Sequence, residues 1–220
     1  MKFKFIGNAG GIFTGSSGTK ILNDPWIMDG VFEGSWFHYP PLKTKLSDLN
    51  DVDAIYVSHI HPDHYDERYF DFPKDVPLII LNEGPNFLKK NLITKGYKNF
   101  IEIKHDQSVK FKEFNLTLYK PWTGHIYEES LIGDLINSSL VIEDNGVIAI
   151  NFNDNTPDEK ACLFLKNKFK NIDLAMLNYN AGGPYPSCFD NLSIDEKKIE
   201  SERIAQRNLE HACKMISVLK

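Results

Sequence analysis

Six residues, His59-Ile60-His61-Pro62-Asp63-His64, restrict this chain more than any other stretch. They hold three of the seven histidines together with one aspartate. They closely follow Ala54-Ile55-Tyr56-Val57, an apolar run that is typical of a buried strand. Since His59 and His61 are two positions apart, both imidazoles point to the same face if they stand at a strand end. The segment therefore predicts a metal site at the end of a strand, and we expect it to be the active site.

Imidazole and carboxylate ligands suit Zn²⁺, with Fe or Mn²⁺ as alternatives, better than they suit soft Cu(I). A catalytic site needs further ligands and a position that is open to water. Two downstream residues are candidates: His125, in a loop between strands, and Asp154, just past the apolar run Val147–Phe152. The end of a strand at that run would present Asp154 at the same edge as the histidines.

The predicted elements begin with strands alone and continue with strands that alternate with helices. Strands are predicted at 2–6, 12–13, 20–22, 53–58, 78–81, 101–103, 110–119, 135–142, 147–152 and 174–177, and helices at 85–96, at 158–169 and from 193 to the end. Residues 24–41 are rich in aromatics, Gly and Pro, which favours an ordered loop. With no repeat or linker, the sequence predicts a single α/β domain over residues 1–220.

The last predicted helix is strongly charged and carries one apolar stripe. The stripe consists of Ala205, Leu209, Ala212, Ile216 and Leu219, which recur at helical spacing.

Composition excludes several classes of protein. A net charge of −5 without a basic stripe argues against nucleic-acid binding. Three cysteines without CxxC spacing argue against a disulfide framework or a thiolate zinc site, and they favour a reducing compartment. The N-terminus does not resemble a signal or transit peptide, and no apolar run is long enough to span a bilayer. We therefore expect a cytoplasmic protein that acts on a small molecule, with its oligomeric state left open.

The histidine cluster resembles the HxHxDH signature of the metallo-β-lactamase-fold superfamily. Gly124-His125 is similar to the third-histidine motif of that superfamily. Asn153-Asp154 is similar to its bridging-aspartate motif, with Asn153 where many members have glycine. The resemblance implies a four-layer αββα sandwich, with the metal site at the edge between the two sheets.

Three further segments narrow the resemblance to one branch. Asp24-Pro25-Trp26, Gly34-Ser35-Trp36 and the loop Asn178–Phe189 resemble the branch that contains the metal domain of CMP-N-acetylneuraminate hydroxylase. Sugar-phosphate lactonases and N-acyl-phosphatidylethanolamine phospholipase D-like hydrolases look like more distant relatives. The branch implies a phosphorylated or nucleotide-linked substrate, such as a sugar derivative.

Carried over by position, the resemblance implies that His59, His61 and His125 hold a first metal ion. Asp63, His64 and Asp154 would hold a second ion, with Asp154 as the bridging ligand. Two cations together lower the pKa of a bound water and orient it for attack. Asp63 would also act catalytically by steering the proton of that water. The candidate substrate-binding residues are His38, Trp36, Tyr179, Gly182, Gly183 and Tyr185, although His38, like His105, has the surroundings of a packing or surface histidine.

The chain departs from the superfamily in two ways. A last strand normally supplies one more histidine, whereas here the only later histidine, His211, lies inside the predicted final helix. The second site is then short of a ligand, the sequence is a piece of a longer protein, or this protein departs from the pattern, so we expect the αββα fold with or without its last strand. The paired Cys-x-His elements of an iron–sulfur module are also missing, so hydroxylation is not carried over.

Three functions remain in competition. The first is a metal-dependent hydrolase in which a dinuclear site activates water against a phosphoester, lactone or acyl bond. The second is an iron-dependent redox enzyme on the same scaffold, because the same ligands accept iron. The third is a metal-stabilised binding module without catalytic activity.

Overall fold

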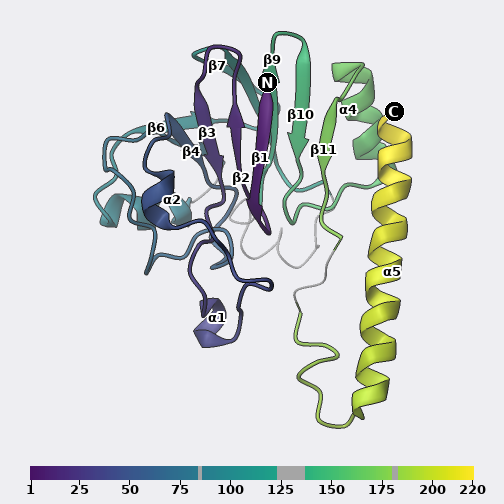
Figure 1. Cartoon of the computed structure of the whole chain (residues 1–220). Helices are drawn as coiled ribbons and strands as arrows, with labels where there is room; N and C mark the ends of the chain where they lie inside the picture. Colours follow the sequence, from purple (N-terminus) through teal and green to yellow (C-terminus); the bar gives the residue numbers. More distant parts are fainter. Residues whose placement is uncertain (84–85, 123–136, 180–182) are drawn as a thin grey trace.

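Two β-sheets packed face to face form the centre of the molecule, and helices lie on their outer faces (Figure 1). This computed structural model describes residues 1–83, 86–122, 137–179 and 183–220. The first sheet has the strand order β1-β2-β3-β4-β5-β6, and the second has the order β11-β10-β9-β8-β7.

The first sheet changes from antiparallel to parallel at β3. Its strands are β1 (Lys2–Gly7), β2 (Gly10–Thr14), β3 (Lys20–Asn23), β4 (Ala54–Tyr56), β5 (Leu78–Leu81) and β6 (Phe100–Ile103). The strands β1 to β3 form an antiparallel meander, whereas β3, β4, β5 and β6 run parallel to one another. Parallel strands are buried on both faces. For this reason β4 and β5 have continuous apolar sequences, and their C-terminal ends meet at one edge of the sheet.

The second sheet is mostly antiparallel. Its strands are β7 (Ser108–Phe111), β8 (Phe114–Tyr119), β9 (Ser139–Asp144), β10 (Val147–Asn151) and β11 (Leu174–Met176). The hairpin between β9 and β10 turns at Asn145-Gly146, a dipeptide that is typical of such turns. Both residues have positive φ (53° and 75°), as a tight two-residue hairpin turn requires. The single strand predicted at 110–119 is wrong. Lys112 adopts φ 49° and splits that run into the hairpin β7–β8, although no glycine marks the turn.

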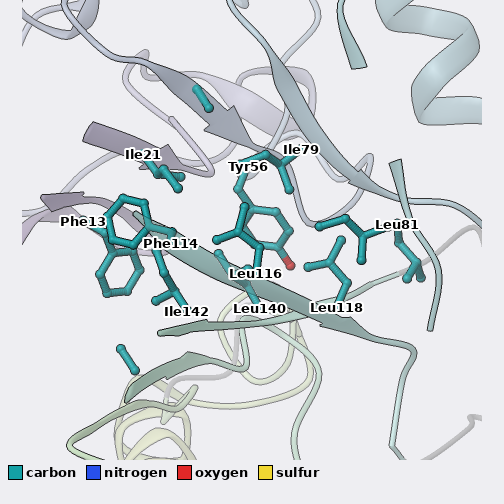
Figure 2. Close-up of a cluster of buried hydrophobic side chains, with 13 residues drawn as sticks. Phe13, Ile21, Tyr56, Ile79, Leu81, Phe114, Leu116, Leu118, Leu140 and Ile142 are labelled. Carbon is teal, nitrogen blue, oxygen red and sulfur yellow. The ribbon is translucent and has the colours of Figure 1, made fainter. Parts of the chain in front are cut away.

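The main hydrophobic core lies between the two sheets (Figure 2). Phe13, Ile21 and Ile79 of the first sheet face Phe114, Leu118, Leu140 and other buried residues of the second sheet. The alternation of side chains along each strand places these residues on the inner faces. This packing fixes the position of one sheet relative to the other, and with it the edge where their loops meet.

The helices complete an αββα arrangement. Helix α2 (Phe87–Thr94) packs Leu88 and Leu92 against the outer face of the first sheet. Helices α4 (Glu159–Phe169) and α5 (Ile194–Leu219) cover the second sheet, as Figure 1 shows. The short helix α1 (Val31–Gly34) and the 3₁₀ helix η1 (Leu46–Leu49) lie in the connection between β3 and β4. No strand follows β11 in the described part of the chain.

Helix α5 begins as its sequence predicts, with a capping box between Ser193 and Glu196, but its apolar stripe is only partly correct. Ala212 and Leu219 are buried, whereas Leu209 is 48% exposed. Only the C-terminal part of α5 lies against α4, and its N-terminal part projects beyond the sheets (Figure 1). The apolar residues of the helix cover a broad arc, and the contact with α4 buries one side of that arc only. Within the described residues, no helix combines the length and the apolar character that crossing a bilayer requires.

The contact between α4 and α5 can be tested at two adjacent positions. Met215 is 2% exposed and its Sδ lies 3.6 Å from Sγ of Cys162, whereas Ile216, which the sequence placed in the stripe, is 37% exposed. We expect Met215→Ala to lower the free energy of unfolding by about 2–5 kcal/mol, because it removes buried methylene groups and leaves a cavity. Ile216→Ala should lower it by less than about 1 kcal/mol. Urea denaturation of both variants measures the difference, and equal losses would contradict the observed helix orientation.

Candidate metal centre

Polar residues gather where strands of the two sheets end at a common edge. Because β3 and β4 are parallel, Asp24 and His59 follow their C-terminal ends side by side. The strands β10 and β11 are also parallel, so Asp154 and Asn178 follow their ends in the facing sheet. The edge therefore brings together residues that are far apart in sequence; Asp24 and Asp154, for example, are 130 positions apart.

The first group of candidate ligands is His59, His61 and Asp154, whose ligand atoms all lie within 4.8 Å of one another. Nε2 of His59 lies 2.9 Å from Nδ1 of His61 and 3.8 Å from Oδ2 of Asp154. Two imidazole nitrogens bound to one tetrahedral zinc ion would be separated by about 3.3 Å, given Zn–N bonds of about 2.0–2.1 Å. The donor atoms therefore have the spacing that a shared metal ion needs.

The second group is Asp63, His64 and Asp154. Nε2 of His64 lies 3.3 Å from Oδ2 of Asp154 and 3.5 Å from Oδ2 of Asp63. Oδ1 of Asp63 is buried and has no hydrogen-bond partner among the described residues. A buried carboxylate oxygen without a partner costs free energy, and a cation would satisfy it. Asp154 belongs to both groups, as a bridging ligand must.

Asp24 and Ser58 hold the two buried histidines from behind. Asp24 is fully buried, and its Oδ1 accepts a hydrogen bond of 2.7 Å from the backbone N–H of Ser58. Its Oδ2 lies 3.1 Å from Nδ1 of His64. The hydroxyl of Ser58 lies 2.8 Å from Nδ1 of His59. These contacts leave Nε2 of both imidazoles pointing to the ligand groups, because the opposite nitrogen is already occupied.

The sequence did not identify Asp24 or Ser58 as functional residues, although Asp24 follows one predicted strand and Ser58 is the last residue of another. In the sequence, Asp24 stands out only as part of the Asp24-Pro25-Trp26 resemblance. The one available signal for Asp24 as a site residue was its position directly after β3, at the end of a strand. Sequence position alone, however, does not show that β3 and β4 are neighbours.

The charged and buried side chains of the site shift one another's pKa values. Burial, together with the charges of His64 and His61, holds the pKa of His59 well below its usual range. Burial also lowers the pKa of His64, but the charges and hydrogen bonds of Asp24 and Asp154 outweigh it and raise that pKa well above normal. Burial raises the pKa of Asp63. For Asp154 burial acts in the same direction, but the hydrogen bond and charge of His64 prevail and lower its pKa.

Asn153 explains one departure from the superfamily pattern. It is buried in the turn after β10 with φ 51°, a left-handed conformation that glycine or asparagine adopts most readily. Its side-chain amide donates to the carbonyl oxygen of Ser138 at 3.1 Å and to the hydroxyl of Tyr56 at 3.3 Å. Asparagine therefore adopts this conformation at a lower cost than most residues, and it also ties the turn that carries Asp154 to β4 and to the residue before β9.

The candidate substrate-binding residues lie on two loops. Trp36 and His38 belong to the connection between β3 and β4, where Nδ1 of His38 lies 2.7 Å from Oδ1 of Asp29. The ring of His38 is buried against Trp26 at a centroid distance of 4.0 Å, and its Nε2 has no partner among the described residues. Contact of His38 with substrate therefore stays a prediction.

The second loop follows β11. Tyr179 is exposed, Tyr185 donates to Oε2 of Glu200 at 3.0 Å, and Gly183 is surrounded by open space. Gly182 and the predicted ligand His125 lie outside the described residues.

Comparison with solved structures identifies the fold. The chain superposes on a candidate metal-dependent hydrolase from Veillonella parvula with a TM-score of 0.60 and 22% identity, over 76% of this chain and 68% of the other. It superposes on an isothiocyanate hydrolase from Delia radicum gut bacteria with a TM-score of 0.59 and 22% identity, over 77% of this chain and 68% of the other. The metallo-β-lactamase fold protein YhfI from Bacillus subtilis also matches, with a TM-score of 0.50 and 19% identity, over 77% of this chain and 62% of that protein. The chain therefore has the metallo-β-lactamase fold, as its histidine motif predicts.

The curated relatives that the sequence matches include members of the branch that it resembles. It is 32% identical, over 202 residues, to a protein of Mycolicibacterium smegmatis described as a candidate Rieske 2Fe-2S iron–sulfur protein, covering 86% of this chain and 36% of that protein. Matches also include the mitochondrial N-acyl-phosphatidylethanolamine-hydrolyzing phospholipase D of Saccharomyces cerevisiae (27% identity, 47% of this chain, 22% of that protein). The cytidine monophosphate-N-acetylneuraminic acid hydroxylase of Asterias rubens matches as well (28% identity, 39% of this chain, 15% of that protein).

The chain spans about a third of the length of the mycobacterial relatives that it matches. No protein-family model matches the sequence.

Proposed function

We propose that this chain is a metal-dependent hydrolase with a dinuclear centre. The observation that carries the proposal is the convergence of two donor groups on Asp154 at one edge of the sandwich. Imidazole nitrogens and carboxylate oxygens suit Zn²⁺, or Fe or Mn²⁺. When bound, two such ions lower the pKa of a water molecule and polarise the bond that it attacks.

The residues divide into three roles in this proposal. His59 and His61 hold one ion together with His125, which follows Trp122 by three positions in the sequence. The backbone N–H of Trp122 donates to the side chain of Asn155 at 2.9 Å, so Trp122 lies beside the turn of Asp154. Asp63 and His64 hold the second ion, with Asp154 between the two. Asp63 also steers the proton of the attacking water, through the carboxylate oxygen that does not bind the ion.

The proposed substrate is a small phosphorylated or sugar-like molecule with a phosphoester, lactone or acyl bond. Two relatives support this class by their names, one acting on a phospholipid and the other on a nucleotide-linked sugar. We further propose that residues 1–220 act as one domain, and that the protein works in the cytoplasm.

Metal analysis combined with chelation tests the proposal. We expect a purified sample to hold one to two equivalents of zinc, iron or manganese per chain by mass spectrometry. Removal of the metal should lower hydrolysis of bis(p-nitrophenyl) phosphate or dihydrocoumarin by at least about 10³-fold, because the nucleophile then loses its activation. Re-addition of the same metal should restore the rate. A sample without stoichiometric metal, or with activity unaffected by chelation, would contradict the proposal.

A second candidate function is iron-dependent oxidation. It is favoured by the structure of a CmlA β-hydroxylase, which superposes with a TM-score of 0.62 over 99% of this chain and 43% of that protein, at 14% identity. Another structure of CmlA is described as a diiron β-hydroxylase. An iron-loaded sample that consumes oxygen would favour this function, whereas a colourless zinc protein would count against it. Measured turnover of any kind would also exclude a purely structural, metal-stabilised binding module.

A further inference from the structure

The short helix α1 and Gly30, which precedes it, form a single turn (residues 30–34) with an unusual backbone conformation beside the candidate metal centre. Four of its five residues have positive φ: Gly30 (82°), Phe32 (52°), Glu33 (54°) and Gly34 (86°). Glycine tolerates this conformation, but phenylalanine and glutamate adopt it at a cost of order 1–3 kcal/mol each. Such a cost persists only where surrounding contacts impose it, and it is concentrated at functional positions.

Several contacts hold the turn in place. The backbone N–H of Gly30 donates to the carbonyl oxygen of Trp36 at 2.7 Å, and that of Trp36 donates to Val31 at 3.1 Å. Val31 is fully buried beneath the turn. The guanidinium of Arg68, which lies beyond the histidine motif, donates to the carbonyl oxygen of Gly30 at 2.9 Å. The turn is therefore fixed to the same segment of chain that carries His61.

The aromatic rings of this loop form a row that starts at the metal centre. The ring of Phe32 lies 6.4 Å from that of His61 and 4.6 Å from that of Trp36, measured between centroids. Trp36 lies 6.3 Å from Trp26, which in turn packs on His38. Phe32 is thus the aromatic residue of this loop that is next to a candidate ligand.

Burial along the row shows which rings a ligand can reach. Trp26 and His38 are buried, whereas Phe32 and Trp36 are partly exposed. The two buried rings support the row from behind, and the two half-buried rings keep a free apolar surface. A flat ring packs on such a surface in an offset or tilted arrangement.

We propose that Phe32, backed by Trp36, is the substrate-contacting wall of the metal centre, and that the substrate carries a flat unsaturated ring close to the bond that is hydrolysed. This inference rests on the proposed hydrolytic function and narrows its substrate class. An aryl group or a nucleobase fits the wall, whereas a small aliphatic substituent gains little from it. The left-handed backbone of the turn holds Phe32 at this position.

Binding of two phosphonates tests the wall without requiring turnover. Phenylphosphonate and methylphosphonate offer the same metal-directed group and differ in the flat ring. We expect the metal-loaded protein to bind phenylphosphonate about threefold to tenfold more tightly in calorimetric titrations, as one aromatic pair contributes. Phe32→Ala should abolish this preference and leave the affinity for methylphosphonate and the metal content unchanged. Phe37→Ala, on the same loop but 64% exposed, is the matched control and should keep the preference.

Equal binding of the two phosphonates, or binding of neither, overturns the proposed wall. So does a preference that survives in Phe32→Ala. The hydrolytic function is judged separately on the same sample, by its metal content and by turnover of aryl and aliphatic esters. If the protein binds metal and hydrolyses esters but does not prefer phenylphosphonate, the proposed role of Phe32 is wrong and the proposed hydrolytic function stands.

Discussion

Replacement of His61 by alanine is expected to lower hydrolytic activity by at least about 10³-fold and to release the first metal ion. His61 supplies one of three donor atoms that lie within 4.8 Å of one another, with its Nδ1 only 2.9 Å from Nε2 of His59. Alanine offers no donor atom, and an ion that loses one of its imidazole ligands is held more weakly. Mass spectrometry of the metal content and steady-state hydrolysis, measured on the same sample, check both parts of this prediction.

His105→Ala is the matched control for this experiment. His105 is exposed, its Nδ1 accepts from the backbone of Lys120 at 3.1 Å, and it belongs to neither donor group. The control should keep its metal and at least about half of the activity, since surface substitutions seldom disturb a distant site. If the His61 variant keeps full activity, His61 is not a ligand of the catalytic metal, and the proposed hydrolytic mechanism is wrong.

Asp24→Asn is expected to weaken binding of the second metal ion by about 10- to 100-fold. Asp24 belongs to neither donor group. Its carboxylate instead lies 3.1 Å from Nδ1 of His64, the ring nitrogen opposite the proposed ligand atom, and accepts a hydrogen bond from the backbone N–H of Ser58. Asparagine keeps the shape and removes the negative charge, so His64 becomes a poorer and less firmly oriented ligand. Competition with a chromophoric zinc chelator measures the change, and thermal unfolding shows that the variant is folded.

Asp29→Asn provides a control with the same chemistry at a different histidine. Asp29 also pairs with an imidazole, that of His38 at 2.7 Å, yet it lies outside both donor groups. Its substitution should leave the metal affinity unchanged within about twofold. Ser58→Ala, which removes a hydroxyl contact with His59, should weaken binding by a smaller factor than Asp24→Asn. If Asp24→Asn binds both ions as tightly as the native protein, Asp24 does not position His64.

Much of the fold was predictable because local signals and packing agree. The apolar residues of β4 and β5 indicated buried strands, and Asn145-Gly146 indicated the hairpin between β9 and β10. The charged helical pattern that starts at Ser193 indicated the start of α5. In each of these elements the backbone conformation is set by residues that are close in sequence, so the sequence pattern is sufficient.

The errors arise where distant contacts decide the outcome. Lys112 adopts a left-handed conformation without glycine, so the alternating run around it conceals the hairpin of β7 and β8. Along α5 the sequence shows an apolar arc, but α4 determines that Met215 is buried and Leu209 is not. Similarly, nothing local shows that the turn carrying Phe32 lies beside His61.

The sequence by itself determined the chemistry of the centre. The spacing from His59 to His64 specifies several nitrogen and oxygen donors on one short loop, whatever the rest of the chain does. The sequence also suggested Asp154 as a partner of those histidines, and the structure places it within reach of them. The tertiary structure alone placed Asp24 behind His64 and set Phe32 beside His61. The physical reason is that parallel strands end at a common edge, and that the packing of two sheets makes their edges coincide. Spacing along the chain therefore defines the ligands, whereas strand order decides which distant residues complete, orient and enclose them.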